Sequence, residues 1–280
     1  SPITSISDPL AIVRVTLFYG YLAALVLTGI LMQCSPSTSI VCRSPIRLRL
    51  PCAYKRWRMW HTSLGELFIG LSLFTWLVLF VWISMLLDSM SISPTEHLTP
   101  SSKWLKQLGG ICGQMLNVLV ALALLPVNKG SGITRALGLP WECANIYHRG
   151  MGLAVVFVGL LHVAMEHSLW IAENVYVRNL FAYVQANSGL TIWPWAVPMM
   201  HIVFLLLLAA AFASCEYCRR RWYFIFVGMH VLIMPVFVVA TLLHSWDAWR
   251  YSIVALTFYV SDNLERARAF FIQKFFSEQA

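Results

Sequence analysis

Charged residues are scarce in this chain. Only 11% of its 280 residues are Asp, Glu, Lys or Arg, whereas 59% are hydrophobic, and the mean hydropathy is +0.70. A soluble domain of this size carries about 25% charged residues, so the composition excludes an ordinary water-soluble protein. The sequence therefore predicts a protein that lies in a lipid bilayer.

Several signatures of other protein classes are also missing. The sequence has neither a Gly-x-Gly-x-x-Gly phosphate fingerprint nor strand–helix alternation, so we expect no nucleotide-binding domain within these residues. The positions of the seven cysteines imply no disulfide framework, and the Cys215-x-x-Cys218 pair alone is weak evidence for a metal site. Aromatic residues are not interleaved with the basic runs, which argues against nucleic-acid binding.

Long apolar runs are abundant instead. A helix needs about 20 mostly apolar residues to cross a hydrocarbon core of about 30 Å. We therefore predict a polytopic all-α bundle whose last span is marginal and extendable back to Trp246. The predicted spans are Ile12–Met32, Leu64–Leu87, Leu105–Val127, Tyr147–Met165, Trp193–Ala213, Trp222–Leu243 and Tyr251–Val260.

The basic residues indicate which way the bundle faces. Most of the 20 Lys and Arg residues lie in alternate loops, namely between Arg43 and Arg58, at Lys129 and Arg135, at Arg219–Arg221, and from Arg266 onward. Cytosolic loops of membrane proteins carry such an excess. We expect the amino terminus outside and the carboxy terminus in the cytosol, with anionic lipid as partner of the basic loops.

Four histidines repeat one interval. His148 and His162 lie in the fourth span and His230 and His244 in the sixth, and 14 residues separate each pair. At 100° per residue, 14 residues end within about 40° of four full turns, so both members of a pair share a face, about 21 Å apart. Two crossings separate the spans, which makes them parallel, so His148 is level with His230 and His162 with His244.

This arrangement predicts two stacked b-type hemes, because imidazoles from facing helices can ligate heme iron on both axial sides. A single buried histidine is more often a polar core residue, but the repeated interval favours ligands. Phe237 lies midway between the predicted hemes as core filler or electron-path residue, and Arg149 is predicted to pair with a heme propionate or to reach the membrane surface. Gly152 and Gly159 could admit the macrocycle or serve helix packing.

At these residues the chain resembles the ferric reductase-like transmembrane family, which includes ferric-chelate reductases and NADPH oxidases. The segments are YHRGMGLAVVFVGLLH, ending at His162, and RRRWYFIFVGMHVLIMPVFVVATLLH, ending at His244. The preceding LLPVNKGSGITRALGLPWECANIYHR is similar to plant-type ferric-chelate reductases. The resemblance implies a six-helix diheme core with one additional amino-terminal helix. The corresponding expected divisions are residues 1–62, 63–265 and a cytosolic linker at 266–280.

The resemblance also implies a function. Electrons would pass from cytosolic NADPH through FAD, on a domain outside this chain, to the His148/His230 heme and the His162/His244 heme. An extracytosolic ferric chelate would accept them beside Glu166 and His167, with the further candidates Glu173, Glu96 and His97. His201 is a polar core residue or spare ligand, and His61 is expected to be solvated.

Three alternatives remain open. A superoxide-generating NADPH oxidase would share everything but the acceptor, although Glu166 stands where the oxidase branch typically has a second histidine. A heme-only subunit would receive electrons from quinone or a partner reductase. A non-heme transporter would use the histidines structurally. The resemblance favours the plasma membrane as location.

Overall fold

The computed structural model describes residues 9–34, 45–46, 62–91, 99–125, 131–181 and 196–277, and almost all of this part of the chain is helical. The predicted Glu96, His97 and His61 lie outside the described residues. The long helices are α1 (Pro9–Cys34), α3 (Leu64–Ser91), α4 (Pro100–Leu124), α6 (Trp141–Ala172), α8 (Ala196–Ala213), α10 (Tyr223–His244) and α11 (Trp246–Ser277).

Short elements connect the long helices. These are α5 (Gly132–Ala136), α7 (Tyr176–Phe181) and α9 (Glu216–Arg221), and the antiparallel pair β1 (Pro45–Ile46) and β2 (Thr62–Ser63) lies between the first two long helices. In β1 and β2, Pro45 is opposite Ser63 and Ile46 opposite Thr62.

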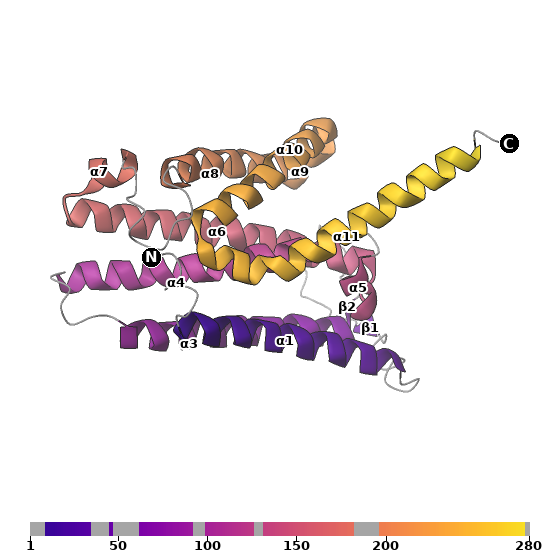
Figure 1. Ribbon diagram of the computed structural model, residues 1–280, viewed down its shortest axis with the longest axis horizontal. Coiled ribbons are helices and arrows are strands. Elements are labelled where there is room, and N and C mark those ends of the chain that lie inside the picture. The colour runs from indigo at the N-terminus through magenta and orange to yellow at the C-terminus, as the bar shows by residue number, and fades with distance from the viewer. Residues whose placement is uncertain are drawn as a thin grey trace, which may run out of the picture.

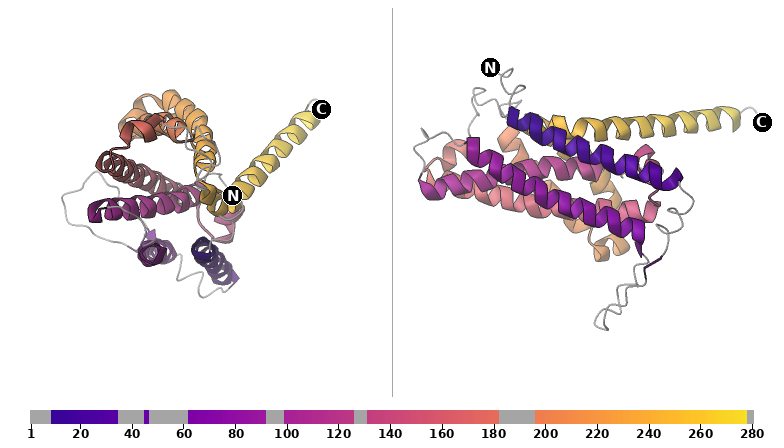
Figure 2. Two further views of the ribbon diagram at one scale, coloured as in Figure 1. Left: turned by 60° about the vertical axis from the view of Figure 1, so that its left-hand side comes forward. Right: turned by 90° about the horizontal axis from the view of Figure 1, so that it is seen from below.

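The long helices form a bundle of three layers with α4 and α6 in the middle (Figure 1). α1 and α3 pack side by side on one side of this central pair, and α8 and α10 pack together on the other. α11 packs on α4 and then projects beyond the bundle, as the turned views also show (Figure 2). Successive long helices alternate in direction, so α6 and α10 run parallel, as the sequence predicted.

Composition and length support the membrane assignment. Five described helices are long and apolar enough to cross a bilayer: α1, the Leu67–Leu87 part of α3, α4, α6 and α10. The shorter apolar helix Pro198–Ala213 covers most of the predicted fifth span. Exposed faces carry large apolar side chains such as Phe224, 88% exposed, and Leu153, 72% exposed, as expected for contact with lipid tails.

The last helix differs from the predicted span in its extent. α11 begins at Trp246, as the extended prediction allowed, and continues without a break to Ser277. It therefore runs through the predicted division between residues 265 and 266. Only its first half lies against the bundle, where Tyr251 and Ala255 are buried.

Two apolar clusters share α4. One joins α4 to α1, α3 and α11 around Phe18, Phe80 and Tyr251. The other joins α4 to α6, α8 and α10 around Val155 and Phe237. Because α4 contributes residues to both clusters, it is the central helix of the fold.

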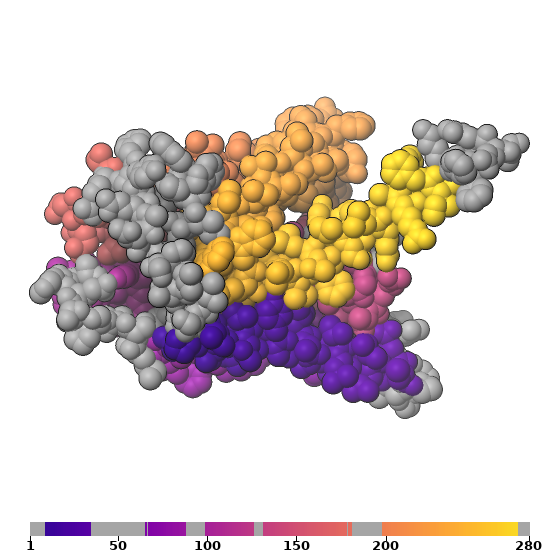
Figure 3. Space-filling view, in the orientation of Figure 1, coloured from indigo at the N-terminus to yellow at the C-terminus, as the bar shows by residue number. Residues whose placement is uncertain are grey.

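Polar contacts also hold α1 against the bundle. The Tyr19 hydroxyl donates to the backbone carbonyl oxygen of Arg250 in α11, and Arg14, only 6% exposed, interacts electrostatically with Tyr251. On the space-filling face in Figure 3, α11 lies along α1 before projecting away from it. α1 is thus part of the folded bundle.

A glycine in α1 allows a close approach to α5. A Cβ atom added at Gly29 would lie 2.9 Å from the Ala136 carbonyl oxygen, and Gln33 donates its amide to the same oxygen at 2.7 Å. Backbone atoms cannot move aside easily, so a larger residue at this position must separate the two helices.

We expect Gly29→Val to destabilise the α1 attachment by about 1–3 kcal/mol, the usual cost of overpacking. Thermal unfolding and hydrogen exchange of α1 in detergent would measure the loss. Gly20→Val is the matched control, because a Cβ at Gly20 meets nothing within 4 Å. Equal protection of α1 in both variants would contradict this account of the contact.

Candidate functional site

Two of the four histidines face each other between α6 and α10. The ring centroids of His148 and His230 lie 6.0 Å apart, with an angle of 79° between the ring planes. Two collinear metal–imidazole bonds of about 2 Å place ring centroids about 6 Å apart, with each nitrogen about 1.1 Å from its own centroid. This spacing therefore fits one iron held between the two imidazoles.

Backbone carbonyls of α4 orient both histidines of α6. His148 Nδ1 lies 2.8 Å from the Ala123 carbonyl oxygen, and His162 Nδ1 lies 2.9 Å from the Gly109 carbonyl oxygen. A carbonyl only accepts hydrogen bonds, so each Nδ1 donates and each Nε2 keeps a lone pair. Metal-binding histidines characteristically have their second nitrogen fixed in this way.

The histidines of α10 have unused hydrogen-bonding capacity. Nδ1 of His230 and Nδ1 of His244 are buried and have no hydrogen-bond partner among the described residues. Buried polar atoms are nearly always satisfied in proteins, so two such nitrogens on one helix require an explanation. Coordination through Nε2 would leave each Nδ1 in need of an acceptor, which a polar atom of a bound group would have to supply.

The second pair lies at the other end of the same two helices. His244 is close enough to His162 and His201 to interact electrostatically with both. His162 is held against α4 on one side, and His244 ends α10 on the other. The structure therefore brings together the predicted outer pair, with His201 of α8 as an additional neighbour.

Space for a flat group exists beside the inner pair. A Cβ atom added at Gly152, one turn after His148, or at Gly228, two residues before His230, would meet nothing within 4 Å. Gly159 differs, because a Cβ there would lie 2.7 Å from the Phe204 ring. Gly152 thus fits the predicted approach of a macrocycle, whereas Gly159 admits a side chain of α8.

A packed layer separates the two histidine levels. Phe237, 7% exposed, packs in one cluster with Val155 of α6, and each residue lies midway between the two histidines of its own helix. α6 and α10 otherwise have little direct backbone contact, since α6 packs on α4 and α10 on α8. The donor set at both levels and the open space beside the inner pair fit two hemes stacked on opposite sides of this layer.

Two glycines of α4 allow this helix to come close to the outer histidine of α6. A Cβ at Gly113 would lie 3.3 Å from His162 Cε1, and a Cβ at Gly109 would lie 2.5 Å from the Glu166 carboxylate. Their four-residue separation is the Gly-x-x-x-Gly pattern typical of close helix pairs in membranes. This pattern is visible in the sequence, but the sequence does not indicate that α6 is the helix that packs against it.

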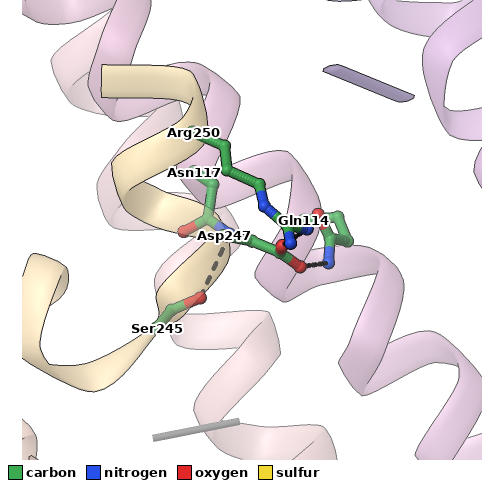
Figure 4. Close-up of polar contacts among 5 residues, drawn as sticks. All are labelled: Gln114, Asn117, Ser245, Asp247 and Arg250. Carbon is green, nitrogen blue, oxygen red and sulfur yellow. Dashed lines mark hydrogen bonds and ion pairs between the residues drawn. The ribbon is translucent and has the colours of Figure 1, made fainter. Parts of the chain in front are cut away.

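A polar cluster holds the turn that follows His244 (Figure 4). Asp247 accepts hydrogen bonds from Gln114 of α4 at 2.8 Å and from Arg250 of its own helix at 2.8 Å. Asn117 of α4 approaches the Ser245 hydroxyl at 3.5 Å. Buried charges in a membrane need such partners, and these contacts position the end of α10 against α4.

The predicted acceptor residues do not form one group. Consecutive helical positions differ by 100°, so Glu166 faces Gly109 of α4 whereas His167 faces α7 and α8. His167 Nε2 lies 2.9 Å from Nε2 of His201, and His167 Nδ1 lies 3.1 Å from the Tyr176 hydroxyl. Glu173 caps the end of α6.

Arg149 is exposed on α6 beside His148. This position is compatible with both the predicted propionate contact and the alternative contact with the membrane surface.

Cys215, in the connection from α8 to α10, is exposed and precedes α9. The backbone N–H of Cys218 in α9 donates to Cys215 Sγ at 3.5 Å. This contact lowers the pKa of the Cys215 thiol from its ordinary value.

Comparison with known proteins agrees with this geometry. Residues 112–241 match the family described as "Ferric reductase like transmembrane component". The chain is 26% identical over 193 residues to "Ferric reduction oxidase 7, chloroplastic" of Arabidopsis thaliana. The aligned segment covers 67% of this chain and 24% of that protein. The chain thus spans about a quarter of the length of this relative. No solved structure matches the chain significantly.

Replacing Gly113 tests the contact between α4 and the outer histidine. Gly113→Leu should displace the His162 ring, break its hydrogen bond to the Gly109 carbonyl and reduce bound heme from two per chain to about one, because an unaligned ligand binds metal 10–100-fold more weakly. Heme extracted from purified chain would be measured. Gly110→Leu should keep both hemes, because a Cβ atom added at Gly110 would meet nothing within 4 Å. Equal heme content in the two variants would contradict the role of Gly113 in orienting His162.

Proposed function

We propose that this chain carries electrons across a membrane through two b-type hemes to a ferric chelate, a proposal supported by the match of residues 112–241 to the ferric reductase-like transmembrane family. The observation that carries the proposal is the pair of histidine levels, each with an α6 imidazole oriented by α4 and an α10 imidazole opposite or near it. The transporter alternative gives no reason for imidazoles of α6 and α10 to be paired at two levels.

The chain's own residues would hold and separate the hemes. His148 and His230 would hold the inner heme, and His162 and His244 the outer one, with Arg149 near an inner propionate. The hemes supply reversible one-electron chemistry, while ligand orientation and burial set their potentials. The Phe237 layer excludes water between the two levels and is the proposed path across the centre.

In this proposal, electrons enter the bundle from its cytosolic end. We propose NADPH and FAD on a dehydrogenase domain or partner at the cytosolic end, since the basic α9 segment Arg219–Arg221 marks that end by the charge rule. NADPH releases two electrons and one proton on oxidation, so each NADPH reduces two ferric ions. The projecting end of α11 lies beyond the same end of the bundle and would lead to that domain (Figure 1).

The orientation follows from the same charge distribution. The beginning of α1 would lie outside and the end of α11 in the cytosol. We propose the plasma membrane as location, so that iron is reduced before uptake. The name of the Arabidopsis relative places that protein in the chloroplast, and imaging of the tagged gene product decides between these membranes.

The superoxide-generating oxidase is the second candidate. The position that the oxidase branch fills with a histidine is Glu166 here, and its carboxylate faces α4 at Gly109, away from His167 and His201. The absence of that histidine is the reason for preferring iron to oxygen as acceptor in this proposal.

Reoxidation of the reduced chain tests the proposed acceptor. Purified chain in nanodiscs, reduced by dithionite and freed of excess reductant, should lose about two electrons to ferric citrate and yield about two ferrous ions, one per heme. Heme absorption and a ferrous-specific dye would measure both quantities. Exposure of the same sample to oxygen should give little superoxide. Rapid superoxide formation without ferric reduction would reverse the assignment.

A further inference from the structure

One histidine pair is not explained by heme ligation. His167 of α6 and His201 of α8 place their Nε2 atoms 2.9 Å apart, and both side chains are only partly buried. They lie at the same end of the bundle as α7, because α7 packs against both α6 and α8 there (Figure 1). We propose that these two Nε2 atoms form an open binding site for a transition-metal ion that receives the electron. The proposal rests on the function proposed above.

The spacing of the two nitrogens suits a metal ion. Two imidazole nitrogens at about 2.1 Å from a metal, in neighbouring positions about 90° apart, are about 3 Å from each other. The observed separation of 2.9 Å therefore needs ring rotation but little translation to bind one ion. The hydrogen bond between the nitrogens occupies the site in the absence of the ion.

The surroundings of His167 hold its ring in place. Trp170 stacks on it with centroids 5.1 Å apart and an angle of 24°, and the Tyr176 hydroxyl lies 3.1 Å from Nδ1. A partner on the second ring nitrogen is characteristic of metal-binding histidines. Tyr176 and Trp170 are thus positioning residues for His167.

Among the described residues, the site offers an ion two protein ligands. Within the ranges the structure describes, no three or more His, Cys, Asp or Glu side chains are arranged to hold a metal. Two protein nitrogens leave the other positions to the ion's own chelator, which permits rapid exchange, whereas four protein ligands would trap the ion. Imidazole is a suitable donor for iron and copper ions.

The site also lies where an electron would leave. His167 follows His162 by five residues, about 7.5 Å along the helix axis, and His201 interacts electrostatically with His244. In the proposed step two labile water ligands leave the ferric chelate and two Fe–N bonds form, while the proton on one Nε2 moves through water to Nδ1 of the same ring. One electron from the reduced chain converts Fe³⁺ to Fe²⁺. The Fe–N bonds then break, two waters bind the iron again, and return of the proton to Nε2 restores the hydrogen bond between the rings.

The test compares two acceptors on the reduced chain in nanodiscs. Ferric citrate can exchange ligands with imidazole, whereas ferricyanide is coordinatively saturated and cannot. For His167→Ala/His201→Ala, the ferric citrate concentration at half-maximal reoxidation should rise at least tenfold, with ferricyanide reoxidation and heme content unchanged. Ser168→Ala/Ile202→Ala, which alters the two exposed neighbours, is the matched control and should behave as wild type.

A direct measurement of metal binding does not depend on electron transfer through heme. Cu²⁺ added to the oxidised chain should give an electron paramagnetic resonance signal split by two imidazole nitrogens in the wild type and the control, but not in the double variant. Unchanged ferric citrate saturation, an equal loss with ferricyanide, or the same Cu²⁺ signal in the double variant would overturn the site. A wild-type chain without heme that still shows this signal would instead refute the proposed function and keep the site.

Discussion

The hydrogen bonds from His148 and His162 to the backbone of α4 are the contacts on which the candidate site depends. Their acceptors, Ala123 and Gly109, are separated by the same 14 residues as the histidines, because α4 and α6 are antiparallel partners. A carbonyl already used within a helix can accept a second hydrogen bond, so the bilayer imposes no penalty on α4. Each α6 imidazole is thereby fixed in one tautomer and one direction.

This constraint explains the uneven packing of the bundle. α6 is held by α4, and α10 is held by α8 and, through the turn after His244, by Asp247 and Gln114. α6 and α10 themselves meet chiefly at the Val155 and Phe237 layer. Open space beside Gly152 and Gly228 lies on one side of that layer, at the level of the inner histidines.

The sequence predicted the helices and the histidine levels well, because both follow from periodicity. Helical rise and rotation alone placed His148 opposite His230, and the structure confirms that placement. The role of α4 was not predictable in this way, since Ala123 and Gly109 act through backbone atoms that carry no residue signature. Gly109 and Gly113 indicate a close helix contact without naming its partner.

The acceptor end shows the limit of reasoning from neighbours in sequence. Glu166 and His167 are adjacent in the chain but face different helices, and the residue that pairs with His167 is His201, 34 positions later. Which helices meet depends on the packing of α6, α7 and α8 together, and one sequence does not reveal it. The heme ligands and the acceptor residues therefore stay predictions that the geometry supports.

The most direct measurement is the reduced-minus-oxidised absorption spectrum of the purified chain, with heme quantified per polypeptide. The account predicts two low-spin b-type hemes in the wild type and about one in His162→Ala or His244→Ala. The lipid-facing variant Phe224→Ala should retain both hemes. A wild-type chain without heme, or two hemes remaining after either histidine is replaced, would contradict it.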